Sequence, residues 1–117
     1  MPSSKAPAQL YQDLRSQYAE LFASRHFEAA YHLLAAAMHM AEELTDMELL
    51  SEIATEAEQS QTQIDRLSSD HRMSSSSAKL RGHLPLFTSL AHTALAAKAR
   101  LDADNAVQRH RRQLKLP

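Results

Sequence analysis

The sequence predicts an all-α protein of about four helices, arranged as an antiparallel helical bundle or as two stacked helical hairpins. Hydrophobic residues make up 44% of the 117 residues, yet only 5% are aromatic and none is Trp. The core must therefore consist mainly of Leu, Ala and Met, which suits the packing of helix on helix. The chain has a single glycine, whereas β-rich folds need glycines in their tight turns. Strand formers are also scarce, with one valine and two isoleucines.

The length is that of one domain, and we expect residues 1–117 to form a single helical domain. Within it we expect a disordered lead at 1–7, a flexible Ser-rich loop at 68–83 and a basic tail at 112–117. The absence of cysteine excludes disulfides, thiolate catalysis and zinc-finger chemistry. The first ten residues lack the apolar run of a signal peptide, and no stretch approaches the ~20 apolar residues that span a bilayer. We therefore expect a cytoplasmic protein without membrane contact.

Apolar spacing predicts the first two helices at 8–24 and 27–44. The turn between them is so short that the two helices must pack antiparallel to each other. The helix at 27–44 is apolar over more than half of its circumference, so it must pack against more than one neighbour. We expect it to be the central helix of the fold, with Leu33 and Met40 covered on its second apolar side.

The third helix is predicted to begin with a capping box, in which Thr45 and Glu48 satisfy each other's amides. Its apolar face runs to Leu67. After the Ser-rich segment, a fourth helix is predicted from about Leu84 to Arg111 or a little beyond. Its apolar stripe fades after Leu101, which predicts a projecting basic end.

Charge is distributed unevenly along the chain. Residues 28–70 hold ten acidic residues and one basic residue, and the remainder of the chain is basic. Antiparallel packing of the acidic third helix on the basic fourth helix sets opposite charges against each other. Because exposed ion pairs contribute only ~0–1 kcal/mol each, this charge layout influences which helices pack together more than it stabilises the fold.

Residues 11–44 resemble a tetratricopeptide-type helical hairpin. Leu14 and Leu21 match its first helix, and the run from Phe27 to Ala30, followed by Leu34 and Ala37, matches its second. The resemblance implies a helical-hairpin protein with a protein-binding role. The chain departs from the family where Tyr18 replaces a small residue and Glu42 replaces a proline, and no second copy of the repeat is visible.

Four residues of the second predicted helix are candidate metal ligands. Glu28, His32, His39 and Glu43 share one side of the helix, and two i, i+4 pairs among them could each reach one ion. No Glu-x-x-His motif accompanies them, although di-iron bundles use that motif. We interpret the four residues as part of a solvent-exposed polar face, and we predict no metal and no cofactor. The serines lack a glycine-flanked elbow and the chain lacks a phosphate-binding loop, so we predict no enzymatic activity.

The basic C-terminal end is a candidate contact for nucleic-acid phosphates through Arg109, Arg111, Arg112 and Lys115. No aromatic residue interleaves with these bases, and the sequence pI is about 6.6. Cations at a helix C-terminus also have a structural role, because they offset the helix dipole.

The leading hypothesis is a non-catalytic protein-interaction or scaffold module that binds a protein partner or itself as a homo-oligomer. The alternative is a small regulator that contacts nucleic acid through its basic C-terminal helix. A metal site on the second helix is the third hypothesis.

Overall fold

The computed structural model describes residues 5–115, which contain five α-helices and no strand. The all-α prediction is thereby confirmed, with four long helices close to their predicted positions and one short additional helix. The helices are α1 (Pro7–Ala23), α2 (Phe27–Glu43), α3 (Met47–Leu67), α4 (Ser75–Leu80) and α5 (Leu86–Leu114).

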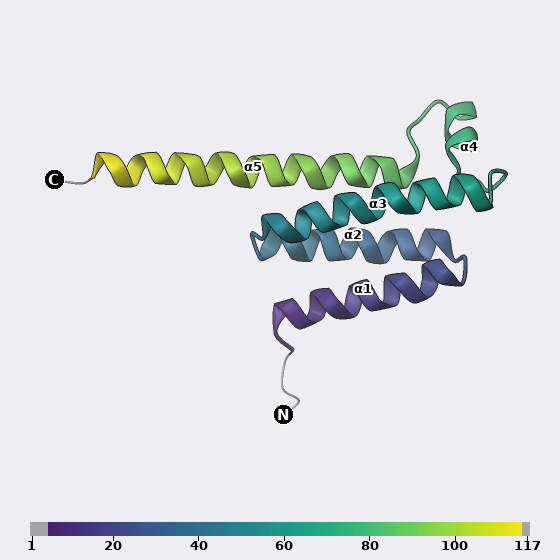
Figure 1. Cartoon of the computed structure of the whole chain (residues 1–117), viewed down its shortest axis with the longest axis horizontal. Helices are drawn as coiled ribbons and strands as arrows, with labels where there is room; N and C mark the ends of the chain where they lie inside the picture. The colour runs from purple at the N-terminus through teal and green to yellow at the C-terminus, as the bar shows by residue number, and fades with distance from the viewer. Residues whose placement is uncertain (1–4, 116–117) are drawn as a thin grey trace.

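The four long helices lie side by side with alternating direction (Figure 1). α1 packs on α2, α2 on α3 and α3 on α5, and the backbone of α2 also approaches that of α5. The short α4 contacts the end of α3. The result is a flat molecule of 63 × 44 × 18 Å, from which α5 projects far beyond the other helices (Figure 1).

An aromatic cluster joins the helices at the end of the molecule where α1 turns into α2. Phe22 of α1 contacts Phe27 of α2 and Phe87 of α5, with ring centroids 4.9 and 6.0 Å apart. Tyr31 meets Phe87 edge-on at 5.6 Å, and His71 meets Phe27 at 5.1 Å. The contact between Phe22 and Phe87 joins α1 to α5 through side chains, although the backbones of the two helices do not approach each other.

The prediction that α2 is central is confirmed by its neighbours and its burial. α2 contacts α1, α3 and α5, and its axis lies between α1 and α3. Leu33 and Met40 are partly buried and pack against the core. The buried residues of α2 are Phe27, Ala30, Leu34, Ala37, Met38 and Ala41.

Small side chains allow α3 and α5 to approach closely. Ala54 and Ala57 of α3 are buried, as are Ala91, Ala94 and Ala97 of α5. An alanine seam places two helix backbones nearer to each other than leucines allow, and most of the helix-on-helix contact of the molecule forms here or between α1 and α2.

The expected charge pairing between α3 and α5 does not form among the described residues. The acidic side of α3 pairs with α1 instead, through Glu56 and Arg15. On α5, Arg100 reaches Glu42 at the end of α2, 3.7 Å away. The basic residues of α5 that follow Arg100 lie beyond the end of α3, so adjacency of the two helices does not bring their charges together.

The predicted capping box at the start of α3 is wrong. Thr45 has φ of 50° and follows the last turn of α2, where its amide donates to the carbonyl of Glu42. Its hydroxyl donates to the carbonyl of Leu44. Asp46 caps α3 instead, because its carboxylate accepts from the amide of Leu49 at 3.1 Å. Thr45 ends one helix and is therefore not free to begin the next.

The Ser-rich segment at 68–83, predicted as a loop, contains α4. Ser74 caps this helix by accepting from the amide of Ser77. Asp65 of α3 accepts from both the amide and the hydroxyl of Ser75, at 2.7 and 2.5 Å. Gln61 donates to the carbonyl of Met73, whose side chain is buried. Polar groups of α3 thus fix a segment that has little apolar content of its own.

The two predicted terminal segments are only partly described. Residues 1–4 of the lead lie outside the described residues, whereas Lys5 pairs with Asp13 and Pro7 already belongs to α1. In the predicted basic tail, 112–114 continue α5 as helix, and 116–117 again lie outside the described part. Among the helices described, none is both long and apolar enough to cross a membrane.

Replacing Ala94 by Leu tests the alanine contact. Ala94 is fully buried, so the added side chain must push α3 and α5 apart, and we expect a loss of about 1–3 kcal/mol in the free energy of unfolding. Urea denaturation measures this loss. Ala19→Leu, on the exposed side of α1, is the control and should change stability by less than about 0.5 kcal/mol. Equal stability of the two variants contradicts a close α3–α5 contact.

Candidate interaction surfaces

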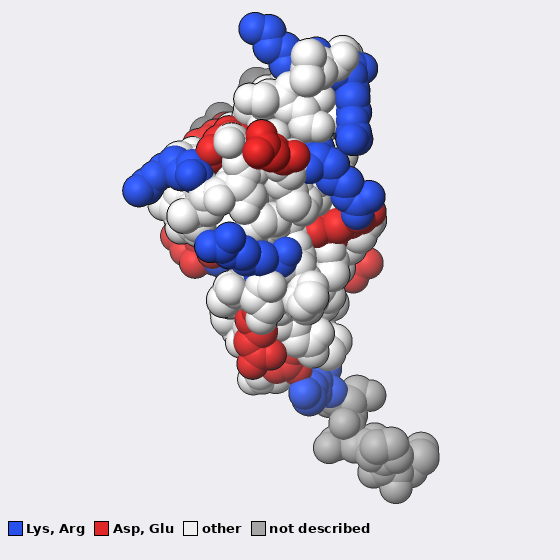
Figure 2. Space-filling view, turned by 90° about the vertical axis from the view of Figure 1, so that its right-hand side faces the viewer, with Lys and Arg blue, Asp and Glu red and all other residues white. Residues whose placement is uncertain are grey.

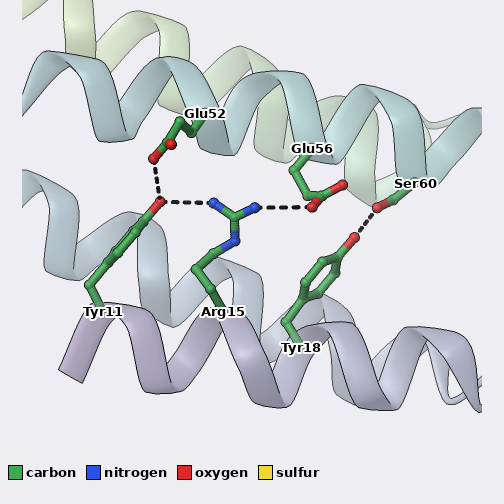
Figure 3. Close-up of polar contacts among 6 residues, drawn as sticks. All are labelled: Tyr11, Arg15, Tyr18, Glu52, Glu56 and Ser60. Carbon is green, nitrogen blue, oxygen red and sulfur yellow. Dashed lines mark hydrogen bonds and ion pairs between the residues drawn. The ribbon is translucent and has the colours of Figure 1, made fainter. Parts of the chain in front are cut away.

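A row of polar contacts joins α1 to α3, and we call it the α1–α3 seam (Figure 3). On α1, Arg15 donates to the hydroxyl of Tyr11 at 2.9 Å and to Glu56 at 3.0 Å. The Tyr11 hydroxyl donates in turn to Glu52 at 3.3 Å. The seam consists of Tyr11, Arg15 and Tyr18 on α1 with Glu52, Glu56 and Ser60 on α3, where Tyr18 and Ser60 share a hydrogen bond.

The seam raises the pKa of both of its tyrosines, which extends the pH range over which they stay neutral. Burial raises the pKa of Tyr18 to about 12, against a smaller lowering by its hydrogen bond to Ser60. Burial also raises the pKa of Tyr11, which Arg15 partly offsets. Desolvation lowers the pKa of Arg15, but the Tyr11 hydroxyl and the Glu56 carboxylate outweigh it and keep Arg15 charged. Neutral phenols and a paired guanidinium form a structural tie between two helices rather than a nucleophile and base.

The candidate metal ligands on α2 point to separate partners. Glu28 forms an ion pair with Arg72, which follows α3. His39 faces Glu42 at 3.6 Å, not Glu43. His32 and Glu43 are exposed. Within residues 5–115, no three His, Asp or Glu side chains lie close enough together to hold a metal ion.

Two hollows border the Glu28–Arg72 ion pair at the end of the molecule where α2 begins. The smaller, of about 200 Å³, lies toward α4 and the start of α5. The larger, of about 500 Å³, lies over the α1–α2 turn and contains His26, His32 and His71. Figure 2 views this end and shows basic side chains in several separate groups with acidic ones between them. The sequence did not reveal this grouping, because His26 and His71 come from turns that are 45 residues apart in the numbering.

The last part of α5 projects beyond the other helices (Figure 1), and we call residues 102–115 the C-terminal arm. Every residue of the arm is exposed. At 1.5 Å per residue the arm is about 20 Å long. It leaves the body of the molecule beside the α2–α3 turn, where Arg100 pairs with Glu42 (Figure 1). The four candidate nucleic-acid contacts all lie on the arm and are exposed: Arg109, Arg111, Arg112 and Lys115.

The apolar side of α5 changes direction between the body and the arm. On the body, the buried stripe of Phe87, Leu90 and Ala94 faces α3 and α2. At about 100° per residue, the arm continues this direction with Asn105, Gln108 and Arg112, which are polar. The opposite direction of α5 carries Ala99, Ala103, Val107, His110 and Leu114, within about 40° of their common direction.

This outer stripe begins at Ala99, one turn before the arm, and is exposed and apolar except at His110. We call it the outer face of the arm. Val107 is 50% exposed and Leu114 is 71% exposed. All four basic residues of the arm lie elsewhere on its circumference. The sequence reasoning missed this face, because it followed only the stripe that continues from the core. The signal for this face is in the sequence: apolar residues recur at helical spacing when the count begins at Ala99 instead of at Phe87.

Comparisons of the chain with protein-family models, with curated proteins and with solved structures give no match. The class to which its fold and surfaces assign it is that of an all-α protein with a projecting helical arm. Two surfaces of described residues distinguish it: the hollowed, mixed-charge end at the start of α2, and the outer face of the arm.

Tyr18→Phe tests the seam through the pH dependence of stability. The folded-state pKa of about 12 exceeds the unfolded value of about 10, so the stability that comes from the neutral phenol is complete below about pH 10. It is lost as the pH rises toward about 12. Urea denaturation should show a shallower alkaline loss for Tyr18→Phe than for the native chain, with about 1 kcal/mol lower stability at neutral pH because Ser60 loses its partner.

Tyr31→Phe, outside the seam, is the matched control for this measurement. It should keep the alkaline loss of the native chain. Identical pH profiles for Tyr18→Phe and Tyr31→Phe contradict a buried, hydrogen-bonded Tyr18.

Proposed function

We propose that the chain is a non-catalytic protein-interaction module whose C-terminal arm binds a protein partner through its outer face. The exposed apolar stripe with Val107 and Leu114 is the observation that carries this proposal. An apolar stripe on a helix that projects into solvent has no role in the chain's own core, and such surfaces mark sites of interaction.

The marginal stability expected of the arm as an unpacked helix supports the proposal that a partner binds it. Isolated helices of fewer than about 12–15 residues are marginal in water, and helical stability in proteins comes chiefly from packing of an apolar face. The arm has that length and an apolar face, but every one of its residues is exposed. Arg111 and Arg112 in its last turn offset the helix dipole, which contributes only about 0.3–1 kcal/mol each. A partner helix on the outer face supplies the missing packing.

The proposed architecture of the module is two stacked helical hairpins, α1–α2 and α3–α5. Its support is that the most extensive packing lies within these two pairs, while the backbones of α1 and α5 stay apart. A closed bundle of four helices requires α1 and α5 to be neighbours. A tetratricopeptide-like first hairpin is compatible with this, since Phe27 and Ala30 of the matched run are both buried between helices.

A matched pair of substitutions on the arm tests the proposed function. Val107→Asp places a charge on the outer face, and Gln108→Asp places the same charge on the polar side of the same turn. Used as baits in extract of the native cell, the native chain and Gln108→Asp should capture the same protein, either another copy or a different one. Val107→Asp should capture at least about tenfold less of this protein, because the introduced charge is left without a partner in an apolar contact. Equal capture by all three baits refutes the arm as the binding element.

Nucleic-acid binding is the second candidate function, and the exposure of Arg109, Arg111, Arg112 and Lys115 on one side of the arm favours it. If these residues neutralise phosphates, binding to duplex DNA or RNA falls steeply with salt, with a slope near −0.9 per phosphate contact on B-DNA. Fluorescence anisotropy over a salt series measures the slope. Arg112→Gln should reduce its magnitude by about one unit, and Val107→Asp should leave this slope nearly unchanged.

A further inference from the structure

Resting on the proposed function, we infer that the partner of the arm is the arm of a second copy, packed antiparallel along the outer face. Two arms placed this way form a symmetric dimer in which the same surface of each copy meets itself. Ala99, Ala103, Val107 and Leu114 of one copy then lie against the same residues of the other, in reverse order. The small side chains along this line allow two helices to approach closely.

The charge of the arm changes sign along its length, and this selects the partner. Its base holds Asp102 and Asp104 and adjoins the acidic α2–α3 turn, with exposed Glu43 and Glu48. The Arg100–Glu42 ion pair places that turn beside the base. The tip carries four cations over seven positions: Arg109, Arg111, Arg112 and Lys115. One copy therefore presents both the cationic tip and the acidic base that a second copy complements.

The same charges decide the direction of packing. A parallel pair places the two cationic tips side by side, and like charges at this spacing repel. An antiparallel pair places each tip against the acidic base of the other copy, and it does so twice by symmetry. On the helical wheel Asp104 and Arg111 lie on the same flank of the outer face, about 20° apart. Antiparallel packing sets equal flanks together, so Asp104 of one copy meets Arg111 of the other.

The size of the contact predicts a reversible dimer. The outer face extends from Ala99 to Leu114, about 23 Å of helix, and its side chains are small. The area buried between two such arms lies at or below the low end for specific interfaces, about 1,200 Å² in total. We therefore expect a dissociation constant on the order of tens of micromolar, with the two bodies held apart at opposite ends of the paired arms.

Sedimentation equilibrium of the full chain, from about 1 µM to about 500 µM, tests the dimer. The native chain should pass from monomer to dimer over this range. Val107→Asp should weaken the dimer at least about tenfold, and the control Gln108→Asp by less than about threefold. A native chain that stays monomeric overturns the inference, as does a dimer that both variants retain equally. A monomer whose capture of a different protein still depends on Val107 refutes only the second copy and leaves the proposed function standing.

Because the chain contains no cysteine, engineered cysteines test the direction. Ala99→Cys lies at the base of the outer face and Leu114→Cys at its tip. When the two variants are mixed and oxidised, antiparallel arms should give mainly the mixed base-to-tip disulfide dimer, and either variant alone should cross-link several-fold more slowly. Faster cross-linking of each variant alone shows a parallel pair and overturns the antiparallel arrangement.

Discussion

The close contact between α3 and α5 is the constraint on which the rest of the structure depends. Buried alanines on both helices, such as Ala57 and Ala94, let the two backbones approach closely. This contact fixes the direction of α5. Because α3 begins at the α2–α3 turn while the antiparallel α5 continues past that turn, the direction that the alanines set is also the direction in which the arm leaves the body (Figure 1).

α1 is attached to α5 and to α3 by two different kinds of contact. At the end where α1 turns into α2, Phe22 of α1 meets Phe87 of α5, so that aromatic burial joins these two helices. Along the rest of α1, the α1–α3 seam joins α1 to α3 through hydrogen bonds and the Arg15–Glu56 ion pair. Partly buried polar groups contribute little net stability when paired, but they are costly when left unpaired. The seam therefore fixes which face of α1 meets α3 more than it holds the two together.

Helix positions followed from periodicity, but their ends and the intervening segment did not. The central place of α2 was predictable because apolar residues cover more than half of its circumference. The role of Thr45 was not, because its sequence pattern fits a capping box while its backbone is needed to end α2. The short α4 was missed as well, since Asp65 and Gln61, which hold it, lie on another helix.

The candidate sites were also predictable only where local spacing determines them. The exposure of the basic residues near the C-terminus was expected, because a stripe that ends at Leu101 leaves the remaining helix without a core to face. Neither the histidines gathered over the α1–α2 turn nor the dispersal of the α2 ligand candidates was predictable, since both depend on which turns meet. Local spacing carries no information about such meetings.

The sequence by itself determined that the chain is helical, where most of each helix lies, and that α5 has one apolar side on the body and another on the arm. Those properties depend on residues within a few turns of one another, and the helical repeat relates them directly. The tertiary structure alone decided that acidic α3 pairs with Arg15 rather than with α5, and that the base of the arm lies beside an acidic turn. Contacts between distant segments depend on how helices of given shape pack, and shape at an interface is set by both partners at once.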